Sequence, residues 1–255
     1  RGLDADLGAY HADTFTKDLH PTLKADFILA NPPFNYNPWG QGKLMNDVRW
    51  KYGIPPASNA NFAWIQHMIH HLAPNGKIGL VLANGALSSQ SGGEGEIRKK
   101  IIEDDLIEGI IAMPPQLFYS VTIPATLWFI SKGKKQKGKT VFIDARKMGH
   151  MVDRKHRDFT EEDIQKLADT FEAFQNSTLE DEKGFCAVAT IQDIAKQDYV
   201  LTPGRYVGIE EKEDDGEPFD EKMARLTSEL ADMFERSHEL EDEIRRKLGA
   251  IGYEI

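Results

Sequence analysis

The sequence predicts an α/β fold with a mostly parallel, doubly wound sheet, because short apolar runs alternate with segments of helical periodicity. Three apolar runs each end abruptly at Asn, Pro or Gly, and they span residues 25–30, 77–83 and 106–113. Two stretches between them, residues 59–73 and 93–104, carry the pattern of helices. Binding sites in such sheets form where the strands end, so we expect one directly after the first apolar run.

The helix expected over residues 59–73 shows the clearest local pattern. Its apolar side chains recur at three- and four-residue steps, and they are Phe62, Ile65, Ile69 and Leu72. Ser58 or Asn59 is expected to cap its N-terminus, and the Pro-Asn-Gly sequence at 74–76 is expected to end it.

Two more strands are expected at residues 126–131 and 140–144, paired antiparallel across a loop rich in Lys and Gly. After Arg146 the alternation of strands and helices stops. Residues 160–174 predict a helix capped by Thr160, whose acidic first turn suits the helix dipole.

The last part of the chain is expected to form an appendage. Residues 210–217 are an acidic stretch without apolar content, which predicts a disordered linker. Apolar residues then follow a heptad-like pattern, with Ser237 as its one polar position: Met223, Leu226, Leu230, Met233, Leu240 and Ile244. This helix either packs on the body or docks on a partner. We therefore expect a body over 1–157, a connecting region over 158–208, and a linker with an amphipathic helix over 209–255.

The net charge of −10 is unevenly distributed along the chain. Residues 210–255 hold 16 acidic and 7 basic residues, a net of −9, so residues 1–209 are almost neutral at −1. Within that body, residues 131–157 contain 10 basic and 2 acidic side chains, a local charge of +8. An overall acidic charge alone would argue against nucleic-acid binding, but this strip does not.

Composition excludes several classes of protein. No apolar run approaches the roughly 18 residues that a membrane span needs, and no signal peptide opens the chain. The single Cys186 can form neither an internal disulfide nor a cysteine-rich zinc site, which fits a cytoplasmic protein. Because the first residue is Arg1 and a strand-and-loop pattern begins almost immediately, we expect a piece of a longer protein.

The Asn31-Pro32-Pro33-Phe34 sequence after the first apolar run suits methyl transfer to an exocyclic amine. The lone pair of an adenine amine is conjugated with the ring, so the nitrogen is a poor nucleophile. Two acceptors, the Asn31 side-chain carbonyl and the Pro32 backbone carbonyl, would bind the two N–H groups and free the lone pair, and the prolines would hold these acceptors in place. Phe34 offers a stacking surface worth about 1–3 kcal/mol. The base would have to flip out of the duplex. The alternative is a proline-rich loop whose Asn caps a turn.

This sequence and the segments after it resemble the modification subunits of type I restriction–modification systems, which are adenine-N6 DNA methyltransferases. The resemblance covers roughly residues 1–207 and runs through several motifs in order. They are 31–35 (Asn-Pro-Pro-Phe-Asn), 47–50 (Asp-Val-Arg-Trp), 52–56 (Tyr-Gly-Ile-Pro-Pro), 59–68 (Asn-Ala-Asn-Phe-Ala-Trp-Ile-Gln-His-Met), 82–85 (Leu-Ala-Asn-Gly), 116–119 (Gln-Leu-Phe-Tyr), 123–125 (Ile-Pro-Ala), 127–129 (Leu-Trp-Phe) and 201–207 (Leu-Thr-Pro-Gly-Arg-Tyr-Val).

The resemblance implies a Rossmann-like methyltransferase sheet, here partial and without its first strands, and S-adenosylmethionine as the methyl donor. It implies that Asn31, Pro32 and Phe34 bind and orient the target adenine, with Asn31 also close to the donor. Asp13 resembles the acidic motif that contacts the adenine half of the donor, with Phe15 as its apolar neighbour. Phe118 resembles a second aromatic that packs against the flipped base. Asp13 as an ordinary turn residue and Phe118 as a core residue are the alternatives.

The family's glycine-rich loop, which binds the methionine part of the donor, has no counterpart in these residues. We therefore expect these 255 residues to be inactive alone. The resemblance also implies partners: double-stranded DNA, a specificity subunit, a restriction subunit and a second modification subunit.

Two further clusters of side chains are candidate sites. His67, His70 and His71 have a spacing that can bind metal, but no Cys or carboxylate joins them on the expected helix, so we expect no metal site. The side chains of Lys134, Lys135 and Lys137 could bind DNA phosphates, or they could belong to a solvated loop.

The expected function is that of an adenine-specific DNA methyltransferase, with residues 1–157 as the catalytic portion. Two alternatives stay open. One is a non-catalytic assembly module that keeps the fold, and the other is a related methyltransferase that acts on RNA or protein.

Overall fold

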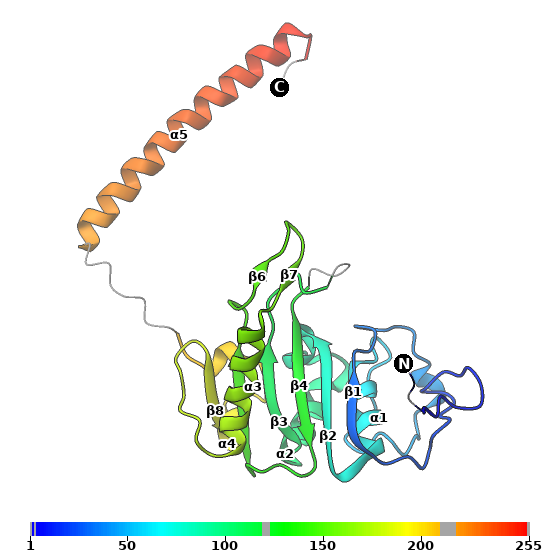
Figure 1. Cartoon of the computed structure of the whole chain (residues 1–255). Helices are drawn as coiled ribbons and strands as arrows, with labels where there is room; N and C mark the ends of the chain where they lie inside the picture. The colour runs from blue at the N-terminus through cyan, green and yellow to red at the C-terminus, as the bar shows by residue number, and fades with distance from the viewer. Residues whose placement is uncertain (1, 3, 119–122, 210–217, 254–255) are drawn as a thin grey trace. The chain divides into compact units, whose positions relative to one another are not determined.

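The chain is described by a computed structural model that covers all residues except 1, 3, 119–122, 210–217 and 254–255. It divides into two compact units, Arg1–Glu210 and Glu211–Ile255. The first unit is built on a six-stranded sheet (Figure 1). In spatial order its strands are β1 (Ala25–Ala30), β2 (Leu72–Ala83), β4 (Ala125–Ser131), β3 (Ile107–Ala112), β5 (Lys139–Asp144) and β8 (Cys186–Thr190).

Four strands, β1, β2, β3 and β5, run in one direction, as the α/β pattern predicts. β4 lies antiparallel between β2 and β3, and β8 lies antiparallel beside β5. The expected pairing of residues 126–131 with 140–144 is therefore wrong, because β4 fills the place between β2 and β3 and β5 pairs with β3. The predicted class is confirmed, but the sheet is mixed rather than mostly parallel in its pairings.

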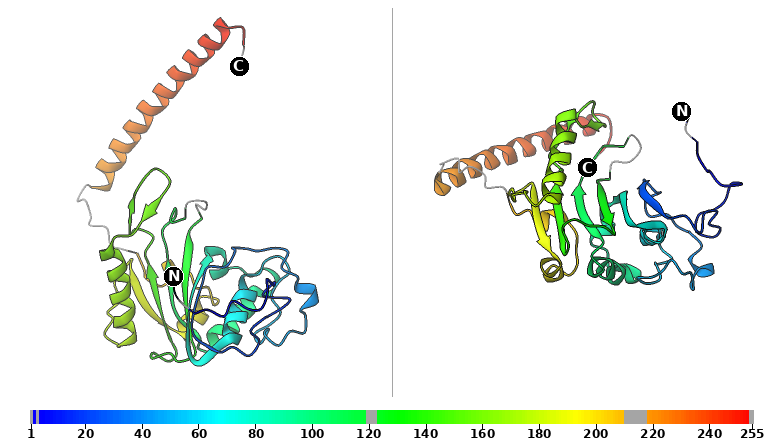
Figure 2. Two further views of the ribbon diagram at one scale, coloured as in Figure 1. Left: turned by 45° about the vertical axis from the view of Figure 1, so that its right-hand side comes forward. Right: turned by 60° about the horizontal axis from the view of Figure 1, so that its bottom comes forward.

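Helices cover both faces of this sheet (Figure 2). α1 (Asn61–His71) and α2 (Glu94–Glu103) pack on one face, where they share a core with Trp128, and α4 (Ile191–Lys196) adds Ile194 to it. α3 (Glu161–Gln175) packs on the other face with Val141 and Ile143. Because side chains alternate along β5, Phe142 faces the first core and its two neighbours face the second.

The observed ends of α3 and α1 show which sequence patterns predict helix boundaries correctly. Thr160 caps α3 in a capping box with Asp163, as predicted. The expected helix over 59–73 begins later, at Asn61, with Ala60 as a cap that makes no side-chain hydrogen bond. It also ends earlier, because residues 72–76 extend β2 instead of forming a turn.

Short elements complete the first unit. They are the 3-10 turns η1 (Gln41–Lys43), η2 (Asn84–Leu87), η3 (Ser91–Gly93) and η4 (Pro203–Arg205), and the two-stranded hairpin of β6 (His150–Met151) and β7 (Arg157–Asp158).

Buried polar bonds hold the N-terminal segment on α1. The Arg49 guanidinium donates to the backbone carbonyls of Thr14 (3.1 Å) and Phe15 (2.5 Å), and it pairs with Asp47 at 2.7 Å. The same group lies 3.1 Å from His67 Nδ1, so that nitrogen accepts the hydrogen bond and the His67 ring is neutral. One cation therefore joins three segments that are distant in sequence.

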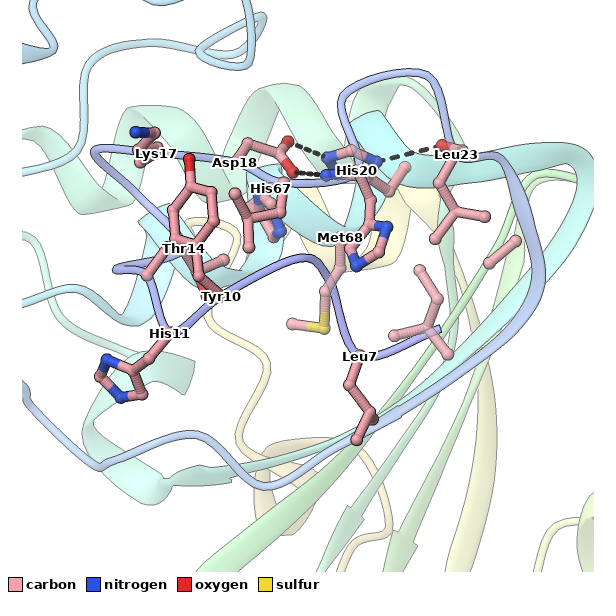
Figure 3. Close-up of a pocket in the computed structure, with 15 residues that line it drawn as sticks. Leu7, Tyr10, His11, Thr14, Lys17, Asp18, His20, Leu23, His67 and Met68 are labelled. Atoms are coloured by element: carbon pink, nitrogen blue, oxygen red, sulfur yellow. Dashed lines mark hydrogen bonds and ion pairs between the residues drawn. The ribbon is translucent and has the colours of Figure 1, made fainter. Parts of the chain in front are cut away.

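A cavity of about 420 Å³ lies between the N-terminal segment and α1, and Asp18, Leu23 and His71 are among the residues that line it (Figure 3). His71 contacts Asp18 through Nε2 (2.7 Å) and the Leu23 carbonyl through Nδ1 (3.0 Å). Burial, together with the neighbouring His71 and Arg49, lowers the pKa of His67 to about 4. The segment is thus held by the Arg49 cation and by the hydrogen bonds of His71, beside a His67 ring that stays neutral.

The second unit is described as a single helix, α5 (Phe219–Ala250), which confirms the amphipathic helix of the sequence prediction. The apolar residues of its expected seam are all exposed, with Met223 at 43% and Leu230 at 49%. The expected linker over 210–217 lies outside the described residues. Across the described part of the chain, no helix has the length and apolar character to cross a membrane.

The environment of His67 predicts a loss of stability in mild acid. Because the folded state holds the pKa near 4 and an unfolded His titrates near 6.5, the unfolded chain binds the extra proton between these values. The free energy of unfolding should therefore fall by about 1–2 kcal/mol from pH 7 to pH 5 through this group. Urea unfolding of wild type and His67→Asn at both pH values measures it. An equal pH dependence in both proteins would contradict the assignment.

Candidate active site at the carboxyl edge of the sheet

The Asn31–Phe34 sequence lies at the edge of the sheet where β1 ends, as its position after an apolar run predicts. Because β2, β3 and β5 run with β1, their last residues reach the same edge, which we call the carboxyl edge. Asn31 is exposed, Pro32 is buried and Phe34 is half-buried. Asn31 also borders an apolar cavity of about 440 Å³, formed with Leu29 and neighbouring residues of β2 and β4.

A reciprocal pair of asparagines holds this loop. The Asn35 backbone N–H donates to Asn61 Oδ1 (3.1 Å), and Asn61 Nδ2 donates to Asn35 Oδ1 (2.8 Å). Asn35 has a φ of 53°, in the left-handed region that costs free energy for a residue with a Cβ atom. The two hydrogen bonds offset this cost and tie the loop to the first residue of α1. The sequence pattern predicts no role for Asn61, although an Asn at a helix start is a common polar partner for a neighbouring loop.

The structure brings Phe34 and Phe118 together. Their ring centroids are 6.2 Å apart and their planes meet at 81°, an edge-to-face contact. Phe118 belongs to the segment that follows β3, so strand direction delivers both rings to the carboxyl edge. The two aromatics expected at one site are thus neighbours.

Asp13 and Phe15 occupy one tight turn. Asp13 Oδ1 accepts hydrogen bonds from the backbone N–H groups of Phe15 (3.0 Å) and Thr16 (2.8 Å) and from the Thr16 hydroxyl (3.0 Å). The Phe15 ring is buried against Trp39 and Trp64. Burial leaves this ring little surface for a ligand, whereas the Asp13 carboxylate is exposed.

Lys134 does not have the exposed position that DNA contact requires. Its side chain is 1% exposed and its Nζ lies 2.5 Å from Asp105 Oδ1, while burial lowers the pKa of Lys134. Asp105 Oδ2 also accepts from the backbone of Gly138, so the pair closes this loop. The expectation of a DNA contact is corrected for Lys134, whereas Lys135 and Lys137 are exposed.

The basic strip of residues 131–157 divides between two edges of the sheet. Because β4 is antiparallel, the loop with Lys135 and Lys137 lies at the edge opposite Asn31, about 20 Å away along the seven residues of β4. Residues 146–157 follow β5 and lie at the carboxyl edge. Only this second group shares an edge with the Asn31 loop.

Three potential metal ligands, Asp18, His67 and His71, approach within 4.8 Å of one another. The sequence pattern missed Asp18 because it lies outside the histidine helix. Asp18 and His71 bond to each other, and one His67 nitrogen accepts from Arg49. These bonds would have to break for a cation to bind, so the cluster is described as a structural network.

Comparison with known proteins agrees with this geometry. Residues 1–215 match the family model described as N-6 DNA Methylase. The chain is 56% identical, over its whole length, to the HindI methylase subunit of a type I restriction enzyme from Haemophilus influenzae, of which it covers 58%. Over 99% of its length it is 45% identical to the MjaIX methylase subunit from Methanocaldococcus jannaschii, of which it covers 47%. The chain thus spans about half the length of these relatives.

Solved structures show the same fold. The type I restriction–modification methyltransferase subunit from Streptococcus thermophilus matches 78% of this chain with a TM-score of 0.70 and 30% identity, over 42% of its own length. The EcoKI M protein matches 91% with a TM-score of 0.58 at 18% identity, over 53% of its own length, which supports the fold alone. The chain belongs to the N-6 DNA methylase family and is similar to the methylase subunits of type I restriction enzymes.

Proposed function

We propose that this chain is the catalytic portion of a modification subunit that transfers a methyl group from S-adenosylmethionine to N6 of an adenine flipped out of duplex DNA. The observation that carries the proposal is the Asn31–Phe34 loop at the carboxyl edge, with Phe34 against Phe118. The family match and the relatives' names agree with it.

The proposed chemistry needs acceptors but no general base. The side-chain carbonyl of Asn31 and the backbone carbonyl of Pro32 accept the two N–H groups of the adenine amine, so the nitrogen lone pair is free to attack. The donor supplies an electrophilic methyl group on a sulfonium: the new N–C bond forms as the C–S bond breaks, and the amine then releases one proton. Phe34 and Phe118 hold the base by stacking and edge contact.

For the donor, we propose that Asp13 contacts its adenine half through Oδ2, since Oδ1 is already used within the turn. Phe15 would support this contact from the core, by fixing the turn against Trp39 and Trp64. The exposed Asp13 carboxylate fits such a ligand.

The partners follow from the exposed surfaces. We propose that the apolar seam of α5 docks on helices of a specificity subunit, which would select the DNA sequence. A second modification subunit and a restriction subunit would complete the assembly. Lys135 and Lys137 are proposed as secondary DNA contacts, away from the target base.

Replacing Asn31 tests the catalytic assignment. Asn31→Ala removes one of the two acceptors, so methyl transfer should fall by at least about 100-fold, as when a single oxyanion-hole donor is lost. DNA affinity should stay within a few-fold. The measurement is labelled methyl in DNA, recovered as N6-methyladenine, from the assembled complex with its specificity subunit. Asn46→Ala, at an exposed asparagine farther along the chain, is the matched control. Normal methylation by Asn31→Ala would rule out this role.

Asn61 should act as a positioning residue. Asn61→Ala removes both bonds to Asn35, so the loop loses its fixed geometry and kcat should fall about 10- to 100-fold with little change in KM. Asn59→Ala is the control, because Asn59 accepts from the Asn61 backbone and, within the described part of the chain, makes no hydrogen bond to Asn35. Single-turnover rates compare the two. An equal loss in both variants would assign the effect to the start of the helix.

The seam of α5 should be needed for assembly. Leu226→Asp with Leu230→Asp places two charges on the seam and should abolish co-purification with the specificity subunit. Ser228→Asp with Ala231→Asp adds the same charge away from the seam and should leave assembly intact. Retention of the subunit by the seam variant would show that α5 is not the docking helix.

A further inference from the structure

The β6–β7 hairpin projects from the carboxyl edge of the sheet, beyond the ends of the long strands (Figures 1 and 2). β6 and β7 pair through only two residue pairs, and the turn between them carries Arg154 and Lys155. Both side chains are exposed. The hairpin therefore carries two positive charges outward at the edge that holds the Asn31 loop.

Hydrogen bonds connect this hairpin to the candidate active site. The Arg157 backbone N–H donates to the Gln116 carbonyl at 2.9 Å, and Gln116 Nε2 lies 3.5 Å from the Arg154 carbonyl. Gln116 is two residues before Phe118, whose ring contacts Phe34. The position of the hairpin is thus coupled to the aromatic pair proposed to hold the base.

The tip of the hairpin has a defined conformation. Asp153 Oδ1 accepts from the backbone N–H groups of Lys155 (2.7 Å) and His156 (2.8 Å), and these bonds lower the pKa of Asp153. The Val152 N–H donates to the His156 carbonyl at 2.9 Å. The carboxylate of Asp153 is therefore turned into the loop, toward backbone N–H groups.

The base of the hairpin is also held. Arg157 Nη1 donates to the carbonyls of Met148 and Gly149, both at 3.0 Å. Gly149 has a φ of +75°, and a Cβ there would lie 2.6 Å from the Asp158 carbonyl oxygen, so the strands approach too closely for a larger residue. A hairpin anchored in this way presents its tip at a fixed place.

Several basic residues of the strip are engaged within the protein, whereas Arg154 and Lys155 at the carboxyl edge make no ion pair among the described residues. Lys134 pairs with Asp105, Arg146 pairs with Asp144, and the Arg157 guanidinium binds carbonyls. Among the residues that the structure describes, neither Arg154 nor Lys155 has an ion-pair partner. Their charge is available to an external anion.

We propose that Arg154 and Lys155 bind the phosphates that flank the flipped adenine, so that the β6–β7 hairpin positions the duplex at the active site. This inference rests on the proposed function, which brings DNA to the carboxyl edge. A base that reaches Asn31 leaves its own backbone at this edge, and phosphates are the ligands that exposed Arg and Lys recognise there. Contacts to the phosphates position the duplex and carry no sequence information of their own.

The test compares charge-matched double variants in the assembled complex, with the chain at its natural full length. Arg154→Ala with Lys155→Ala should lower the slope of log affinity against log salt by about 2, since each phosphate contact contributes about 0.9. Lys100→Ala with Lys196→Ala removes two exposed charges from α2 and α4 and should leave the slope unchanged. An equal effect of both pairs, or no effect of the hairpin pair, overturns the proposal.

A chemically modified duplex locates the contact. One neutral methylphosphonate next to the target adenine should weaken wild-type binding several-fold and leave binding by the hairpin variant almost unchanged. Equal weakening of DNA binding in both proteins overturns the proposal. The proposal is also overturned if the hairpin variant keeps its DNA affinity but no longer retains a protein subunit of the complex. Methyl transfer by wild type is scored separately. If wild type binds the unmodified duplex without methylating adenine, the proposed function fails, while the phosphate comparison still decides the role of the hairpin.

Discussion

The direction of β4 is the constraint on which the rest of the structure depends. β4 runs antiparallel between β2 and β3, so β3 ends and β4 begins at the same carboxyl edge. Phe118 follows β3 at this edge, and the same edge receives the Asn31 loop from β1. Because β4 is antiparallel to both β2 and β3, β3 runs in the direction of β1, so Phe34 and Phe118 follow strands that end at this one edge. The aromatic contact therefore follows from sheet topology.

Topology brings the two segments to one edge, and polar bonds then define the local geometry. The Asn31 loop has a strained residue, Asn35, whose left-handed conformation persists because Asn61 satisfies both its backbone N–H and its side-chain oxygen. The Asp13 turn is held by its own carboxylate and by the burial of Phe15. The Asn35–Asn61 bonds and the Asp13 turn fix the backbone of these two loops without a bound ligand. Such preorganisation favours binding of a transition state.

The features that the sequence predicted depend on local chemistry. The apolar runs, the cap at Thr160 and the proline loop after β1 follow from a few consecutive residues. The pairing of β4 was mispredicted because a short Lys/Gly loop between two strands resembles a hairpin, whereas the actual neighbours of β4 are distant in sequence. Burial at every position of β3 shows that both faces of the sheet are covered there, but it does not identify the neighbouring strands. The role of Asn61 and the burial of Lys134 likewise depend on partners far along the chain, Asn35 and Asp105.

The location and pairing of the charged side chains determine the local electrostatic field more than the net charge of the chain does. The net of −10 arises almost wholly from residues 210–255, and the +8 strip is reduced once its partners are known. Lys134 and Arg146 are neutralised by adjacent carboxylates, and Arg157 is used for the base of the hairpin. The antiparallel β4 then separates Lys135 and Lys137 from the carboxyl edge by about 20 Å, roughly twice the Debye length at physiological salt. The positive field near Asn31 consequently depends on the few uncommitted side chains at its own edge, Arg154 and Lys155 above all.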